Sequence, residues 1–247
     1  MNDNWKAKWI WGDGEESPRN EWRCFRKTFE LDSFEDGALS ISADSRYILY
    51  VNGERVGRGP VRSWPSELSY DTYDIGHLLK RGAKNTIAVL VMHFGISNFY
   101  YIRGRGGLLA QLDVTTNGVS RTVAMTDESW YTSIYHGYDS RSPRMSCQHG
   151  FAERVDARLG GTNWYECSLD VGEWQMASVI GTVGMDPWKK LIPRDIPFLT
   201  DEAVYPRRVE SLHQVKPISW STTVDLRNHV MPDSVNHANH VTHVATL

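Results

Sequence analysis

Two loop segments of the sequence combine aromatic rings with arginines. Arg62 and Trp64 follow one strand pattern, and Tyr100, Tyr101 and Arg103 lie between two others. A flat aromatic ring can stack on the apolar face of a sugar, while Arg and Tyr donors bind its hydroxyls. These five residues are therefore a predicted carbohydrate-binding site. The alternative is that the rings anchor their loops or are buried against another part of the protein.

No recognisable constellation for nucleophilic or acid–base catalysis accompanies them. The sequence contains no GxSxG, Walker A or HExxH motif. Its 30 carboxylates are too numerous to be paired from sequence, although glycoside hydrolysis needs two at a defined separation. Residues 104–107 (GRGG) precede a strand and do not join a strand to a helix, so we interpret them as a turn with unusual φ values. We predict no catalytic residue in this chain.

Metal ligation is the remaining chemistry to consider. Four histidines lie near the end of the chain: His229, His237, His240 and His243. No cysteine stands close to them, and we interpret them as polar residues of a terminal segment. Asp44, Asp71 and Asp74 could bind calcium, but no EF-hand-type loop holds them, and capping or turn roles are favoured. We predict no metal and no cofactor.

Short strands separated by turns must position these residues. Leu39, Ile41 and Ala43 alternate with serines, which is typical of a half-buried strand. Residues 46–52 run into Asn52-Gly53 and return as residues 55–59, which predicts a hairpin with a type I′ turn.

The next hundred residues continue the pattern. Residues 74–82 predict a short helix with Asp74 at its start and Gly82 after its end. The apolar run 87–92 predicts a fully buried central strand, and 108–114 and 121–125 predict two strands joined at Asn117-Gly118. Residues 126–150 are predicted to be loop, with order returning at 153–158. We expect an all-β fold, an antiparallel sandwich or jelly roll with one short helix and long loops.

The domain organisation is predicted from changes in the pattern of residue types along the chain. Residues 1–210 are predicted to form one sandwich module that ends in a proline-rich extension, residues 181–208, without a helix or strand of length. Residues 211–247 are predicted to begin a following, truncated β element, with its opening strand at residues 220–226.

Composition excludes several classes of partner. Charged residues make up 23%, the net charge is −3 and the pI is about 6.3, which gives no footprint for nucleic acid. No apolar stretch is long enough to cross a membrane, and the start lacks a signal-peptide pattern. Three cysteines without CxxC spacing suit a reducing compartment, so a cytoplasmic location is expected. Ten Trp and eleven Tyr permit sugar binding but also suit a sandwich core.

Several segments resemble the bacterial α-L-rhamnosidases of glycoside hydrolase family 78. The first group is similar to the start of these enzymes and to their lectin-like, galactose-binding-like module: residues 7–11, 22–29, 43–47, 50–53 and 56–60. Glu153 and residues 156–158 resemble the acidic "YDAR" strand of the family, although Val155 stands where Tyr is usual. Trp174, Ala177 and residues 187–188 and 193–199 resemble the segments that follow.

The resemblance implies a parent enzyme that removes terminal α-L-rhamnose with inversion. Its catalytic glutamates would lie in an (α/α)₆ barrel, C-terminal to this module, so no catalytic residue is carried over to this chain. The expected role is a non-catalytic accessory portion that supports the barrel of the same polypeptide. The alternatives are a genuine carbohydrate-binding module for rhamnose-containing or related glycans, and a self-sufficient enzyme with an unrecognised site.

Overall fold

The structure of the chain is a computed structural model that describes residues 5–144, 146–161, 163–212 and 243–246. The chain divides into two compact units, Met1–Pro197 and Phe198–Leu247. The predicted module boundary at residue 210 stays a prediction. Among the residues so described, no helix has the length and apolar character needed to span a membrane.

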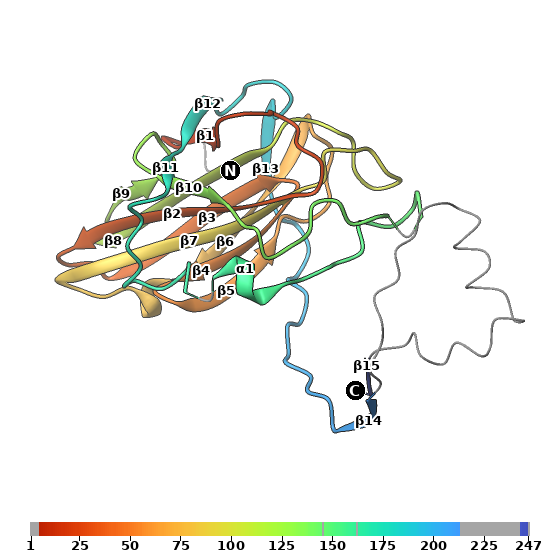
Figure 1. The fold of residues 1–247 in the computed structure, drawn as a ribbon. Helices are drawn as coiled ribbons and strands as arrows, with labels where there is room; N and C mark the ends of the chain where they lie inside the picture. The colour runs from red at the N-terminus through yellow and green to blue at the C-terminus, as the bar shows by residue number, and fades with distance from the viewer. Residues whose placement is uncertain (1–4, 145, 162, 213–242, 247) are drawn as a thin grey trace, which may run out of the picture. The chain divides into compact units, whose positions relative to one another are not determined.

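Two β-sheets form the first unit (Figure 1). The seven-stranded sheet contains β1 (Lys8–Trp11), β3 (Asp36–Asp44), β6 (Glu67–Asp74), β8 (Gly107–Thr116), β9 (Val119–Met125), β12 (Ser178–Thr182) and β13 (Lys190–Pro193). The six-stranded sheet contains β2 (Glu21–Leu31), β4 (Arg46–Val51), β5 (Glu54–Gly59), β7 (Ala83–His93), β10 (Tyr131–Ile134) and β11 (Gln175–Met176). Two short helices, η1 (Gly76–Leu78) and α1 (Ala157–Gly160), complete the unit.

The strand orders are β12-β1-β8-β3-β6-β13, with β9 on β8, and β11-β10-β2-β7-β4-β5. All strand pairs of this unit are antiparallel except β13 with β6, which is parallel. The all-β sandwich predicted from the sequence is confirmed.

The main core lies between the sheets and consists of alternating positions. Leu39, Ile41 and Ala43 of β3 are buried in one cluster with Leu49 of β4 and Val89 of β7. The alternation exists because successive side chains of a strand point to opposite faces. Predicted strand 108–114 obeys the same rule, since its even-numbered residues join this cluster.

The unbroken apolar run in β7 has a specific cause. Val89 and Val91 face the other sheet, whereas Ala88 and Leu90 pack on the outer side in a second cluster with Trp164. Both faces of this central strand are therefore covered, which explains why it lacks the polar alternation of a half-buried strand.

The predicted turns are also present. Asn52 and Gly53 have φ values of 51° and 89°, as a type I′ hairpin turn between β4 and β5 requires. Asn117 and Gly118 repeat this geometry, with φ values of 51° and 73°, between β8 and β9.

Four local predictions need correction. The predicted loop 126–150 contains β10, and the proline-rich extension contains β13. Residues 153–158 form no strand, because only an isolated bridge joins Val155 to Tyr138 before Asp156 caps α1. The helix predicted at 74–82 is only the single turn η1. Short or edge strands escape prediction because tertiary partners, not their own pattern, supply their hydrogen bonds.

The glycines at 104–107 also have a different explanation from the predicted one. None of them adopts a positive φ. A Cβ on Gly106 would lie 2.4 Å from the Trp11 ring, and one on Gly107 would lie 2.4 Å from the Trp188 ring. These two glycines are required because two tryptophans approach the backbone closely.

In the second unit, β14 (Arg208–Leu212) pairs antiparallel with β15 (His243–Thr246). The predicted strand at 220–226 lies outside the described residues, as do His229, His237 and His240. That residues 211–247 begin a separate β element stays a prediction.

Candidate functional site

Two adjoining pockets open at the end of the sandwich where β3 ends, β4 begins and β7 ends. Their volumes are about 210 Å³ and about 130 Å³, and both are lined by Arg46, Phe94 and Tyr100. We call them the first and second pocket. Shared lining residues make them neighbouring compartments of one groove.

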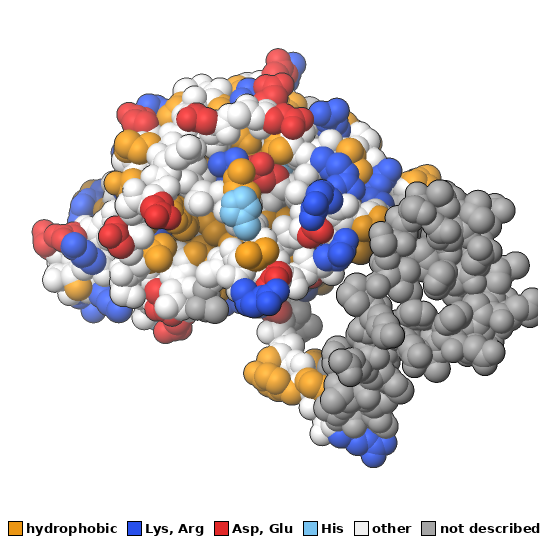
Figure 2. Space-filling view, in the orientation of Figure 1, with side chains coloured by type: hydrophobic (Ala, Val, Ile, Leu, Met, Phe, Trp, Pro, Cys, Tyr) orange, Lys and Arg blue, Asp and Glu red, His pale blue; other side chains and the backbone are white. Residues whose placement is uncertain are grey.

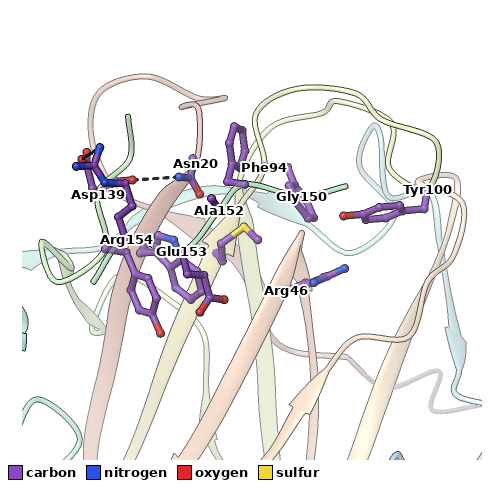
Figure 3. A pocket seen from close by; sticks show the side chains of 13 residues that line it. Asn20, Arg46, Phe94, Tyr100, Asp139, Gly150, Ala152, Glu153 and Arg154 are labelled. Atoms are coloured by element: carbon purple, nitrogen blue, oxygen red, sulfur yellow. Dashed lines mark hydrogen bonds and ion pairs between the residues drawn. The ribbon is translucent and has the colours of Figure 1, made fainter. Parts of the chain in front are cut away.

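Aromatic rings form much of the first pocket (Figure 3). Trp22 is stacked on Tyr138, with ring centroids 3.8 Å apart. Phe94 lies against Tyr100 edge to face, with centroids 5.8 Å apart, and Phe151 follows at 6.3 Å from Phe94. The rings come from β2, from the loops that follow β7, and from residues 138–151, so the tertiary fold assembles this surface.

Acidic, basic and amide side chains also line the first pocket. The Asn20 side chain donates to the carbonyl of Asp139 at 3.3 Å (Figure 3). Asp139 also binds Arg141 at 3.1 Å and Arg154 at 3.6 Å, and the hydrogen bonds from Arg141 lower the pKa of its carboxyl. Asp139 is thereby held as a carboxylate.

Unlike Asp139, the side chains of Glu153 and Arg46 have no ion-pair partner among the described residues. Both side chains line the first pocket and are exposed. The Arg46 guanidinium instead lies 5.2 Å from the ring centroid of Phe94 and 5.6 Å from that of Tyr100. One cation and one carboxylate are thus available to a ligand.

The second pocket contains a buried polar network. The hydroxyl of Tyr101 donates to Asp44 at 2.6 Å, and Asp44 also accepts from Trp188 Nε1 at 3.3 Å. His93 Nδ1 lies 3.2 Å from the same carboxylate. Burial, followed by the charge of Asp44, raises the pKa of Tyr101 far above its usual value. The Tyr101 hydroxyl therefore keeps its proton and uses it in the hydrogen bond to Asp44.

The structure brings together three of the five predicted site residues. Arg62, Tyr100 and Tyr101 line the second pocket. Trp64 is 68% exposed and lines neither pocket. Arg103 lines neither pocket as well, and its Nε donates to Ser17 at 3.0 Å. Whether any of these residues contacts sugar stays a prediction.

Several lining residues were not predicted to belong to a site. Trp22, Arg46 and Glu153 lie in segments that were noticed for their family resemblance and not as part of a site. Asn20 was not singled out. No local signal could have found them, since they lie far apart in the sequence and meet only after the strands pair.

The aspartates considered for calcium are occupied elsewhere. Asp71 is fully buried and binds Arg194, whereas Asp74 accepts from the Gly76 amide at 3.2 Å as a turn residue. Within the described part of the chain, no group of three or more His, Cys, Asp or Glu side chains is placed to hold a metal ion.

Two β-sheets packed on one core, with a small groove at one end, define a β-sandwich domain. The chain belongs to the family of α-L-rhamnosidase N-terminal domains, whose sequence profile matches residues 33–194.

Relatives of known identity agree with this assignment. An α-L-rhamnosidase of Streptomyces avermitilis is 25% identical over an alignment of 195 residues, and the match covers 76% of this chain and 16% of that protein. An α-L-rhamnosidase of Formosa agariphila is 26% identical over 75% of this chain and 22% of its own length. The chain therefore spans less than a quarter of either relative.

Solved structures give the same result. The family 78 rhamnosidase of Bacillus sp. GL1 is 55% identical, with a TM-score of 0.82 over 95% of this chain and 24% of that chain. A Pleurotus ostreatus lectin in complex with GalNAc is 26% identical, with a TM-score of 0.50 over 76% of this chain and 46% of that chain.

Proposed function

We propose that this chain is the non-catalytic accessory lobe of an α-L-rhamnosidase that hydrolyses terminal α-L-rhamnose with inversion. The lobe would support a catalytic barrel in the same polypeptide. The observation that carries the proposal is the coverage: three quarters of this chain matches the curated rhamnosidases, yet only 16–22% of their length.

The carboxylates of the groove support a non-catalytic role. An inverting glycosidase needs a general acid with a raised pKa opposite a general base. The first pocket has two carboxyls, Asp139 and Glu153, but arginine lowers the pKa of Asp139, and Glu153 is exposed to water. This environment lacks the burial that produces a general acid.

Incubating the purified 247-residue chain with an aryl α-L-rhamnoside tests the proposal. We expect no release of the aryl group above that of a Glu153→Gln control. Hydrolysis that survives repurification and disappears in the variant would overturn the non-catalytic role. Reading the source gene beyond the codon for Leu247 provides an independent test, since a long helical region is expected there.

Carbohydrate binding is the second candidate function. It is supported by the likeness to a lectin and by a groove that offers aromatic rings, a free cation and a free carboxylate. Calorimetric titration with L-rhamnose and simple rhamnosides separates binding from scaffolding. The absence of heat at millimolar sugar would exclude this candidate for those ligands.

A cytoplasmic location also stays a proposal. Cys24, Cys147 and Cys167 are all free thiols, which suits a reducing compartment. Fractionation of the source cells, followed by immunodetection, would test it.

A further inference from the structure

Several arginines around the groove have no carboxylate partner in the part of the chain that the structure describes. Four of them form no ion pair with any residue in the described ranges: Arg19, Arg46, Arg62 and Arg144. The chain as a whole carries a net charge of −3, so this local excess of positive charge is not a property of the composition. In Figure 2, several Lys and Arg side chains lie close together toward the right of the visible face, and others lie at its left edge.

Three of these arginines contact the loop that follows β7, and Arg19 lies against a ring of the first pocket. Arg62 donates to the carbonyl of Phe99 at 3.4 Å, and Arg144 donates to that of Ser97 at 3.2 Å. The Arg19 guanidinium lies 4.3 Å from the ring centroid of Phe151, which lines the first pocket. Arg46 lies over the rings of Phe94 and Tyr100, the residues that both pockets share.

The nearby carboxylates offset this charge only in part. Asp44 is buried and already accepts from Tyr101 and Trp188, and Asp139 already binds two other arginines. Glu15 and Glu16 face Arg103 and Arg105, at 4.0 Å and 3.7 Å. Among the described residues that line the two pockets, Glu153 is the one carboxylate left without such a partner, and it lines the first pocket but not the second.

The groove is therefore asymmetric. The second pocket is lined by two arginines, Arg46 and Arg62, and by one carboxylate, Asp44, so its positive charges outnumber its negative ones. The first pocket adds Glu153, Asn20 and further aromatic rings. A guanidinium binds a carboxylate through two parallel hydrogen bonds, and a free glutamate accepts from hydroxyls but repels anions. The ligand that satisfies both pockets has one anionic group and several hydroxyls.

We infer that the groove binds an acidic saccharide, with the carboxylate of a uronic acid between Arg46 and Arg62 and hydroxyls facing Glu153. This inference rests on the carbohydrate-binding candidate above and specifies its ligand class. The volumes, about 210 Å³ and about 130 Å³, fall below the roughly 300–1,000 Å³ of pockets for drug-sized molecules. They suit one or two sugar rings. An acidic peptide fits less well, because repeated negative charges would meet Glu153.

Two matched probes test the charge requirement: methyl β-D-glucuronide and methyl β-D-glucoside, which differ only in the carboxylate. We expect the 247-residue chain to bind the glucuronide at least about tenfold more tightly, as one charge-assisted contact provides. Adding NaCl to about 1 M, where the Debye length is about 3 Å, should reduce this preference.

Variants locate the effect. Arg46→Gln and Arg62→Gln should each lower affinity for the glucuronide by about tenfold and leave glucoside binding within about twofold, while Arg46→Lys retains part of the preference. Arg121→Gln is the matched control, because Arg121 is exposed on β9 beside Val114, at the opposite end of β8 from Gly107 and Asp44. Circular dichroism confirms that each variant is folded.

Each other outcome overturns the inference. Equal affinity for the two glycosides would remove the anionic requirement and leave plain sugar binding standing. Binding of rhamnose but of neither probe would also show that the groove binds a neutral sugar and needs no anionic group. Tighter binding of a polyglutamate peptide than of the glucuronide would indicate an acidic protein partner. No binding of any probe would exclude this groove as a sugar site, whereas the accessory role is judged separately by the hydrolysis assay.

Discussion

Trp188 is stacked on Trp9 with ring centroids 4.0 Å apart and an angle of 30° between the planes. The two rings are fully buried on the outer face of the seven-stranded sheet, in a cluster with Leu109. The Trp188 indole also donates to Asp44, which binds Tyr101 in the second pocket. One residue of the proline-rich extension therefore joins the outer face of the sheet to the floor of the groove.

Replacing Trp188 by Ala should destabilise the first unit by about 3–5 kcal/mol, because a large cavity remains beside Trp9. The measurement is urea denaturation followed by circular dichroism. Trp64→Ala is the matched control, since that ring is exposed, and we expect a change within about 0.5 kcal/mol. Similar losses in both variants would contradict the structural role of the stack.

The buried ion pair between Asp71 and Arg194 provides a second prediction. The distance from Asp71 Oδ1 to Arg194 Nε is 2.5 Å, and the carboxylate also accepts from the Tyr47 hydroxyl. Asp71→Asn should cost about 3–5 kcal/mol, because the guanidinium loses its buried counter-charge.

An ion pair that joins β6 to β13 supplies the control for this change. Lys190 Nζ and Glu67 Oε1 are 3.0 Å apart, but both side chains are about half exposed. Glu67→Gln should therefore cost no more than about 1 kcal/mol. If the two variants unfold at the same urea concentration, burial is not what makes the first pair important.

Alkaline pH should destabilise the first unit through its buried tyrosines. Burial raises the pKa of Tyr73 to about 12, and burial together with the charge of Asp71 raises the pKa of Tyr47 well above its usual value. An unfolded tyrosine titrates near 10, so the folded state holds the proton more tightly. The stabilisation from these tyrosines should be fully present below pH about 10. The free energy of unfolding should then decrease as the pH rises toward 12.

Urea denaturation across this pH range checks the prediction. Tyr73→Phe should make the alkaline loss of stability shallower, because one of the responsible protons is removed. Tyr205→Phe is the control, since that side chain is exposed in the second unit, and its curve should match the parent. A stability that does not change between pH 10 and 12 would contradict the assignment.

The cysteines should differ strongly in reactivity. Cys147 is exposed, whereas Cys24 is buried in β2, and burial raises the pKa of its thiol well above the usual value. A disulfide reagent should label Cys147 quickly in the native chain and Cys24 only in denaturant. Cys147→Ser should remove the fast phase, and rapid labelling of Cys24 in the native chain would disagree with the packing of β2.

Strands with a strong internal pattern were predictable from sequence. The alternation in β3, the apolar run in β7 and the two Asn-Gly turns each depend on neighbouring residues, so a local reading was sufficient. β10 and β13 were missed, since each has only four residues and is held by a partner strand distant in sequence. The parallel pairing of β13 with β6 could not be foreseen for the same reason.

The candidate site, like the fold, was predictable from sequence only in part. Residue type identified Arg62, Tyr100 and Tyr101 as lining residues, because aromatic and arginine side chains in loops are seldom needed for packing alone. It could not show that Tyr101 donates its hydroxyl to Asp44, that Arg103 turns to Ser17, or that Trp64 lines neither pocket.

The sequence by itself determined the class of fold, the positions of the main turns and the family to which the chain belongs, since period-two alternation and Asn-Gly turns are encoded locally. Only the tertiary structure decided which side chains share a groove and which charges stay free. Arg46 and Glu153 line the same pocket although more than a hundred positions separate them. Such a pairing depends on strand register and loop packing, which long-range contacts fix.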